Sequence, residues 1–435
     1  MSWEAELILV FGAFIGFMLG GMWVPFSIAV TALGYLLVVQ GWAGPKAIGL
    51  VGWGSTNGFT LTAIPMFILM AEFLLQSGLS NRVYRGLSLL VRRLPGGLLQ
   101  TNIAGCAMFA AISGSSVATA ASIGTAALPL LDQRGYDPKL STGTLAAGGT
   151  LGILIPPSIA MIIYGTFTDT SVAKLFMAGV IPGLFLAGVF MLYVGVFAII
   201  RPSVAPKQAD SLERIVWPQL LADLLPFALL MTFVMGSMYL GFATPTEAAG
   251  VGCVAAIVIA AVWGGLTFAD FRRALQNTVR ITGSIMFIVV AAFLFSYAVG
   301  IAGLANELVK ALTALGLSRF EFLLAVIVAY IIMGCLVDSI GMMVITIPLL
   351  YPILGVYGVD MIWFGVILVL LIELGQITPP MGINLFVIQS IRPRGTLDEV
   401  LTGAAPFTVL IVLMVGILWA WPEMALWLPA NMATK

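Results

Sequence analysis

The chain alternates between long apolar runs and short polar segments over almost its whole length. The apolar runs fall roughly at residues 6–23, 25–41, 63–78, 97–131, 140–167, 175–200, 217–240, 245–264, 283–302, 320–355, 361–390 and 403–421. Most are close to the roughly 20 residues that cross the hydrocarbon core of a bilayer as one helix. Their continuity excludes a transmembrane β-barrel, whose strands alternate over ~10 residues. The pattern predicts an all-α polytopic membrane protein.

Two of the apolar runs, 97–131 and 320–355, are too long for one crossing. Each carries small or polar residues at its centre, Ser113–Ser116 in the first and Val337–Gly341 in the second. A straight helix of such length would extend about 50 Å, well beyond the bilayer core. We therefore expect two re-entrant helical hairpins, each with its polar tip near mid-membrane.

The distribution of Lys and Arg sets the expected orientation. With the N-terminus outside and each hairpin counted as no crossing, fourteen basic residues fall in inner loops and five in outer loops. This is the asymmetry that the positive-inside rule requires. The first hairpin then opens to the cytoplasm and the second to the outside, and both termini are periplasmic. Two further segments, 43–62 and 266–282, are too polar to span and predict interfacial arm helices; ordinary loops are the alternative.

The chain also resembles itself at a separation of about 223 residues. Gly152–Pro157 matches Gly375–Pro380, and Leu128–Asp137 matches Tyr351–Asp360. We expect two repeats, at 1–200 and 217–435, joined by a cytoplasmic linker at 201–216. Each repeat holds five crossings, one arm helix and one hairpin, and because five is odd the second copy is inverted. Inverted repeats with broken helices are typical of secondary transporters.

A Pro-Pro pair interrupts one apolar run in each repeat. Pro156–Pro157 breaks the helix at 140–167, and Pro379–Pro380 breaks the helix at 361–390. Adjacent prolines remove backbone donors, and the freed carbonyls cannot face lipid. A lone proline in a span is usually a packing kink. A Pro-Pro break repeated by symmetry, opposite a polar hairpin tip, indicates a functional site instead.

Each break and its hairpin tip predict a cage of oxygen ligands for a small monovalent cation, because carbonyls and hydroxyls suit such ions. The first cage comprises Ser113, Ser115, Ser116 and the backbone from Gly149 to Gly152. The second comprises Asp338, Ser339 and the backbone from Gly375 to Thr378. Half-helix N-termini at the breaks favour an anionic solute between the two cages. The residues expected around this solute are Pro156, Pro157, Ser158, Pro379, Pro380 and Asn384.

Three carboxylates near these elements have different predicted roles. Glu373 precedes the second break, where it either ties down the break or takes part in coupling. Glu247 begins a helix, where a structural role at the positive end of the dipole is favoured. Glu72 lies in the span 63–78 with no evident partner, and we expect it to be structural.

Composition narrows the function classes further. Hydrophobic residues make up 61% of the chain and charged residues only 9%, which excludes a soluble enzyme, a disordered chain and a nucleic-acid binder. The chain has no His, so His catalysis, His metal ligation and His proton relays are excluded. No nucleophile–base pair is visible. We expect no enzymatic activity and no cofactor, with Na⁺ rather than H⁺ as the coupling ion.

Four motifs together resemble the large membrane subunit of tripartite ATP-independent periplasmic (TRAP) transporters. They are Ser113–Ser116, Gly152–Ser158, Ala243–Ala249 and Glu373–Leu385. The resemblance implies a multi-pass protein of the bacterial inner membrane that takes up small carboxylates with sodium by an elevator motion. It also implies two partners, a small four-helix membrane subunit and a periplasmic substrate-binding protein. The family's sodium ligands at the tips carry over to Ser113, Ser115, Ser116, Asp338 and Ser339.

Two alternatives remain beside this expectation. One is a stand-alone sodium:anion symporter of the same architecture that needs no binding protein. The other is a channel, which would need a continuous polar pore, whereas here the polar groups cluster at one depth. Dicarboxylates, keto acids, sugar acids and ectoine-like solutes all fit the expected transporter.

Overall fold

The computed structural model describes residues 2–91, 93–206, 217–334, 337, 339–380, 382–392 and 394–433. In these residues the regular structure is helical throughout, which confirms the prediction of an all-α protein. Eight helices are long and apolar enough to cross a membrane, and the bent pair α8–α9 would make nine. The ten crossings expected from sequence exceed this number in part because α1 has only 17 residues.

The helices of the first half follow the predicted order closely. They are α1 (Trp3–Leu19), α2 (Val24–Gln40), α3 (Ala47–Thr56), α4 (Ala63–Gln76), α5 (Leu79–Val91), α6 (Leu98–Ser113), α7 (Ser116–Gln133), α8 (Pro138–Leu154), α9 (Ile159–Phe167) and α10 (Val172–Ile200). α6 and α7 form the two arms of the hairpin expected at 97–131. α8 and α9 form the broken helix expected at 140–167, with a 40° bend between them.

The second half continues with the same kinds of elements. They are α11 (Trp217–Tyr239), α12 (Pro245–Ile259), α13 (Phe268–Ala302), α14 (Leu304–Ala314), α15 (Arg319–Gly334), α16 (Ser339–Val356), α17 (Met361–Gln376), α18 (Ile383–Ile391), α19 (Leu397–Ala420) and α20 (Glu423–Ala430). The succession from α4 to α10 recurs from α13 to α19: an apolar helix, a short amphipathic helix, a pair of hairpin arms, a broken pair and a long helix. The division into repeats at 1–200 and 217–435 and the inversion of the second copy stay predictions.

One predicted boundary is wrong. The segment 266–282 was expected as an interfacial helix separate from the span 283–302, but α13 is one continuous helix of 35 residues. A capping box of Thr267 and Asp270 starts this helix. Its buried residues Ala274, Thr278 and Ile285 recur at helical spacing across the expected boundary, so the polar residues occupy one face and do not interrupt the helix.

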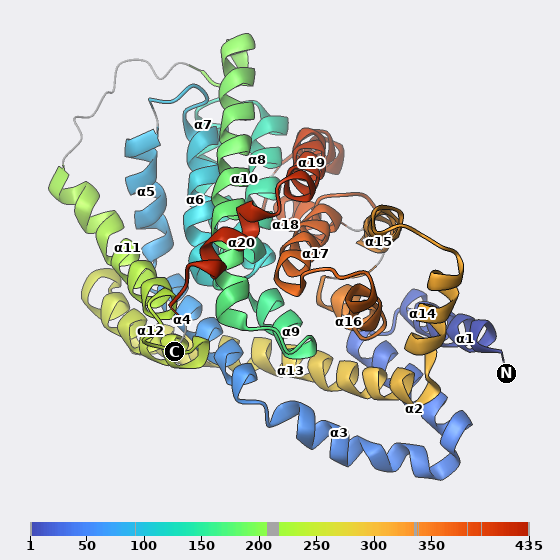
Figure 1. Ribbon diagram of the computed structural model, residues 1–435. Helices are drawn as coiled ribbons and strands as arrows, with labels where there is room; N and C mark the ends of the chain where they lie inside the picture. The colour runs from blue at the N-terminus through green and yellow to red at the C-terminus, as the bar shows by residue number, and fades with distance from the viewer. Residues whose placement is uncertain are drawn as a thin grey trace.

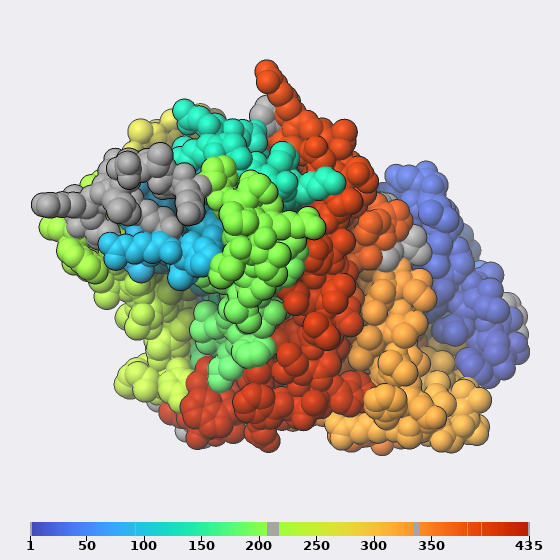
Figure 2. Space-filling model, turned by 90° about the horizontal axis from the view of Figure 1, so that it is seen from above, coloured from blue at the N-terminus to red at the C-terminus, as the bar shows by residue number. Residues whose placement is uncertain are grey.

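The helices divide into two groups that meet across the molecule. α6–α10 pack with α15–α20, while α2–α4 pack with α11–α13, and in Figure 1 α3 and α13 lie crosswise to α6 and α10. Seen from above, the C-terminal helices form a band through the middle of the molecule (Figure 2). The packing inside the first group is close at α8 and α19, where a Cβ on Gly143 would lie 2.1 Å from the Gly403 carbonyl oxygen. Small residues allow such backbone contact between membrane helices.

A buried ion pair joins the two halves of the chain. Asp223 on α11 is only 1% exposed and accepts two hydrogen bonds from Arg85 on α5, at 2.9 and 2.7 Å. The Arg82 Nε lies 3.7 Å from the same carboxylate. α5 also contacts α6 and α7, so this short helix connects the hairpin to the group that contains α11.

Candidate functional site

The first hairpin tip is built directly on the first helix break. α6 ends at Ser113, and Gly114 takes a left-handed φ of +58° that turns the chain into α7. A Cβ on Gly114 would lie 2.8 Å from the Pro157 carbonyl oxygen, so only glycine fits against the break. The Gly114 carbonyl accepts a hydrogen bond from the Ile159 backbone N–H at 3.4 Å.

Small residues also allow α7 to approach α8 closely just before the break. A Cβ on Gly152 would lie 2.6 Å from the Ser115 carbonyl oxygen, and one on Gly149 would lie 2.6 Å from the Ala120 Cβ. The Ser116 hydroxyl donates to the Thr150 carbonyl at 3.3 Å. The structure therefore brings together the residues of the first predicted cage.

Thr119 belongs to this group but was missed by the sequence analysis. Its hydroxyl lies 2.6 Å from the Ser113 hydroxyl, and the Ser113 Oγ also donates to the Ser115 carbonyl at 3.2 Å. Thr119 is fully buried. Its position one turn after Ser115 on α7 places it on the face that carries the tip, which is the signal that could have identified it.

Ser115 and Ser158 begin the two helices that follow the first tip and the first break. The Ser115 hydroxyl accepts from the Ala118 backbone N–H and caps α7, and the Ser158 hydroxyl accepts from the Met161 backbone N–H and caps α9. Both contacts are 3.4 Å long. The hydroxyl oxygens thus satisfy one N–H in each first turn.

The second tip meets the second break in a corresponding way. Ser339 begins α16, and its hydroxyl accepts a hydrogen bond from the Gln376 side-chain amide at the end of α17. Gly334, the last residue of α15, contacts Gly375 through the backbone. The Thr378 hydroxyl donates to the Leu374 carbonyl at 2.6 Å. Asp338 lies outside the described residues, so the second predicted cage is described except for this residue.

Two polar side chains close to the second break are fully buried. Asn384 follows Pro379–Pro380 on α18 and is fully buried; its amide donates to the Ala146 carbonyl of α8 at 3.3 Å. This contact ties the second break to the first broken helix, so Asn384 does not line the cavity described below. Glu373 is also fully buried, and neither carboxylate oxygen has a hydrogen-bond partner among the described residues.

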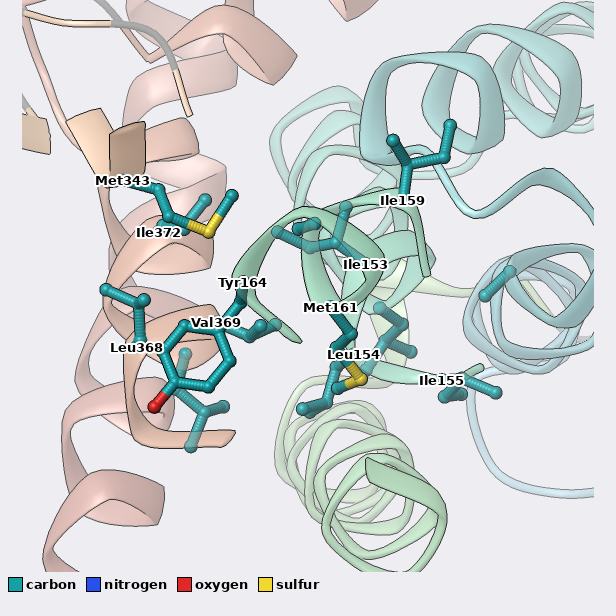
Figure 3. Close-up of a cluster of buried hydrophobic side chains, with 14 of the residues drawn as sticks. Ile153, Leu154, Ile155, Ile159, Met161, Tyr164, Met343, Leu368, Val369 and Ile372 are labelled. Carbon is teal, nitrogen blue, oxygen red and sulfur yellow. The ribbon is translucent and has the colours of Figure 1, made fainter. Parts of the chain in front are cut away.

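An apolar cluster fixes the first break against the second half of the chain. In Figure 3, Tyr164 of α9 lies beside Leu368 and Val369 of α17, whereas Ile159 points away from Met343 of α16. The Tyr164 hydroxyl donates to the Met361 carbonyl at 2.7 Å. The α8–α9 break is therefore held by α16 and α17 of the second half.

Both tips and both breaks open into one cavity of about 240 Å³. Four helices begin at its wall: α7, α9, α16 and α18. The opposite wall comes from α4 and α13 of the second helix group. The residues that line it are Ile68, Ala71, Glu72, Leu75, Ser113, Gly114, Ser115, Ser116, Val117, Ala118, Ile153, Ile159, Ala160, Ile281, Ile285, Ser339, Ile340, Gln376 and Ile383.

The electrostatics of this cavity come mainly from the backbone. Each helix N-terminus carries a partial positive charge and unpaired N–H groups, so four of them together favour an anion. Among the described residues that line the cavity, none is basic and only Glu72 is ionisable. An anionic group would therefore be held by helix ends and hydroxyls and not by an arginine or a lysine.

A two-group helical fold with paired tips and breaks around one cavity is that of a secondary membrane transporter. A solved structure of similar fold is the YdaH transporter of Alcanivorax borkumensis, with a TM-score of 0.60, 16% identity, and coverage of 90% of each chain. Residues 11–424 match the family described as "Tripartite ATP-independent periplasmic transporter, DctM component". The chain belongs to this family of bacterial multi-pass transporter permeases and is not an enzyme.

Three curated relatives illustrate the range of this family. The C4-dicarboxylate TRAP transporter large permease protein of Pseudomonas aeruginosa is 33% identical over 88% of this chain and 89% of the relative. The ectoine TRAP transporter large permease protein of Halomonas elongata is 30% identical over 85% of this chain and 86% of the relative. The isethionate TRAP transporter permease protein DctMQ of Oleidesulfovibrio alaskensis is 30% identical over 95% of this chain and 64% of the relative.

Proposed function

We propose that this permease takes up a small carboxylate-type solute across the bacterial inner membrane together with Na⁺. The convergence of four helix N-termini on one cavity carries the proposal, because it favours an anionic group without a basic side chain. The hydroxyls and carbonyls at the first tip and the Ser339 hydroxyl at the second would supply neutral oxygen ligands for Na⁺ beside that cavity. Relatives named for C4-dicarboxylates and for ectoine have similar identity, so similarity alone leaves the solute class open.

The proposed partners are a small membrane subunit and a periplasmic substrate-binding protein. Support for the first comes from the DctMQ relative, which is longer than this chain and is named as a combined permease. The stand-alone sodium:anion symporter is the alternative. Uptake that persists when the binding protein is left out would favour that alternative.

The proposed transport motion is an elevator movement of α6–α10 and α15–α20 against α2–α4 and α11–α13. The cavity lies between these groups, with the tips on one side and α4 and α13 on the other. The short helices α5 and α14 connect the groups along the chain, and glycines with positive φ, Gly78 and Gly303, precede them. Such a movement would carry the tips and the solute together past α4 and α13.

Uptake in proteoliposomes tests the coupling ion. The vesicles would contain the chain and its small subunit, with the binding protein added outside and a radiolabelled solute identified by a thermal-shift screen on that binding protein. Uptake should follow an imposed Na⁺ gradient. Equal uptake under a pH gradient alone, without Na⁺, would contradict the proposal.

A further inference from the structure

Glu72 on α4 lines the same cavity as the hairpin tips and has no cationic partner among the described residues. Its side chain is 7% exposed, and its Oε2 accepts hydrogen bonds from the Asn277 amide of α13 at 2.9 Å and from the Gln76 amide at 3.2 Å. Its Oε1 accepts none among the described residues. A carboxylate oxygen of a buried side chain is costly to leave without a hydrogen bond, so the Oε1 favours a further donor.

The other end of the cavity has the opposite character. There, the first turns of α7, α9, α16 and α18 present N–H groups. Gln376 lines the same end; its amide donates to Ser339, while its Oε1 is buried without a hydrogen-bond partner among the described residues. The cavity therefore presents main-chain donors and the Gln376 acceptor at the tips, and the Glu72 acceptor at α4.

We propose that the transported solute carries one carboxylate and, at its other end, a hydrogen-bond donor, either an ammonium or a hydroxyl group. The carboxylate binds at the helix N-termini, and the donor binds at the Glu72 Oε1. An ionised second carboxylate only accepts hydrogen bonds, so it would give the Glu72 Oε1 no donor and would leave both oxygens unpaired. This inference rests on the proposed function and goes further by excluding dicarboxylates as preferred solutes.

Asn277 has a positioning role in this arrangement. Its amide and the Gln76 amide both bind Oε2, which holds the carboxylate plane and leaves Oε1 directed away from these two residues. Asn277 is 205 positions from Glu72 in the chain and comes from the other half. The second half of the chain thus orients an acceptor that the first half supplies.

The test compares three solutes of similar length on the purified full chain in detergent with saturating Na⁺. They are γ-aminobutyrate, γ-hydroxybutyrate and succinate, which differ in the group opposite one carboxylate. Binding is measured as the rise in unfolding temperature, followed by tryptophan fluorescence. We expect the first two solutes to stabilise the protein at concentrations about tenfold lower than succinate, which corresponds to ~1.4 kcal/mol.

Glu72→Gln keeps the size of the side chain and replaces one acceptor oxygen with an amide that donates. This variant should bring the three solutes to within about threefold of one another, because the amide can donate to the second carboxylate of succinate, which the Glu72 Oε1 cannot do. Glu307→Gln is the matched control, since Glu307 lies on the exposed side of α14 and pairs with Lys310. It should leave the wild-type order of the solutes unchanged.

The comparison on the wild-type chain needs no variant and decides the inference even if Glu72→Gln folds poorly. Succinate binding as tightly as γ-aminobutyrate, or no stabilisation by any of the three solutes, overturns the inference. Sodium-driven uptake of a solute delivered by the binding protein would still support the proposed function in either case. An unchanged solute order in Glu72→Gln also overturns the inference, because Glu72 would then not contact the solute.

Discussion

Gly334 and Gly375 meet at backbone distance between the second hairpin and the second broken helix. A Cβ built on Gly375 would lie 2.7 Å from the Gly334 Cα, and one built on Gly334 would lie 2.9 Å from the Gly375 Cα. No side chain other than hydrogen fits on either residue without a shift of α15 or α17. The arm of the hairpin and the helix before the break are therefore packed as one unit.

Gly375→Ala should separate these two helices. We expect a loss of about 1–3 kcal/mol in the free energy of unfolding, typical of an overpacked interior, and a strong loss of uptake because the second tip shifts from the break. Gly300→Ala on α13 is the control, since nothing lies within 4 Å of its Cβ position. Thermal unfolding and uptake assays measure both effects, and a Gly375→Ala protein as active as Gly300→Ala would show that the contact is not needed.

Thr119→Val should weaken sodium binding at the first tip. Valine keeps the shape of threonine and removes the hydroxyl that lies 2.6 Å from the Ser113 Oγ. The loss of one buried hydrogen bond, about 1 kcal/mol, should raise the half-saturating Na⁺ concentration about fivefold. The measurement is Na⁺-dependent uptake at fixed solute concentration. Thr125→Val is the control, because the Thr125 hydroxyl bonds only to its own helix at Ala121.

Asp338→Asn tests the acidic residue at the second tip, which lies outside the described residues. If Asp338 helps to hold a cation, removal of its charge should cost about 1.4–2.8 kcal/mol of cation binding and raise the half-saturating Na⁺ concentration about 10–100-fold. Uptake should be poor at low Na⁺ and recover partly at high Na⁺, with a milder shift for Ser115→Ala. Full uptake with unchanged Na⁺ dependence would remove Asp338 from the site.

Arg85→Leu should destabilise the contact between α5 and α11. The change leaves the buried Asp223 with Arg82 at 3.7 Å as its remaining partner. Breaking a buried pair costs ~3–5 kcal/mol, but Arg85 is 49% exposed, so we expect about 1–3 kcal/mol. The exposed pair of Lys310 and Glu307 is the control, and Lys310→Leu should change stability by less than about 1 kcal/mol. Equal unfolding temperatures for the two variants would contradict this assignment.

Two single-cysteine variants test the expected orientation. Ser203 is exposed in the linker that is expected inside, and Ala433 is exposed near the C-terminus that is expected outside, so both positions suit a single cysteine. The Ala433 backbone N–H donates to the Tyr239 carbonyl, which places Ala433 beside the end of α11. On a background without the native cysteines, a membrane-impermeant thiol reagent should label position 433 and not position 203 in whole cells. The reverse pattern would overturn the topology.

The hairpin tips and helix breaks could be predicted because their signals are local. A glycine with positive φ and a Pro-Pro pair each interrupt a helix through their own backbone geometry. In the structure the first tip lies at Gly114, and a helix break lies at each Pro-Pro pair. Thr119, Gln376 and Glu72 escaped prediction because their roles depend on how helices rotate and pack. Glu72 looked partnerless in the sequence since its partner Asn277 lies 205 positions away. The low mean hydropathy of residues 266–282 likewise suggested a separate helix there. The spacing of the buried residues of α13 shows instead that one helix continues through this segment.

The two ends of the cavity differ in how easily a mutation can change the groups that form them. Its tip end is formed by main-chain N–H groups at four helix starts, which persist through most side-chain substitutions. Its far wall is formed by side chains of α4 and α13, which a single nucleotide change can replace. With the proposed solute site, descendants of one ancestral permease would acquire new nutrients through mutations on α4 and α13, without any change in the main-chain donors at the tips.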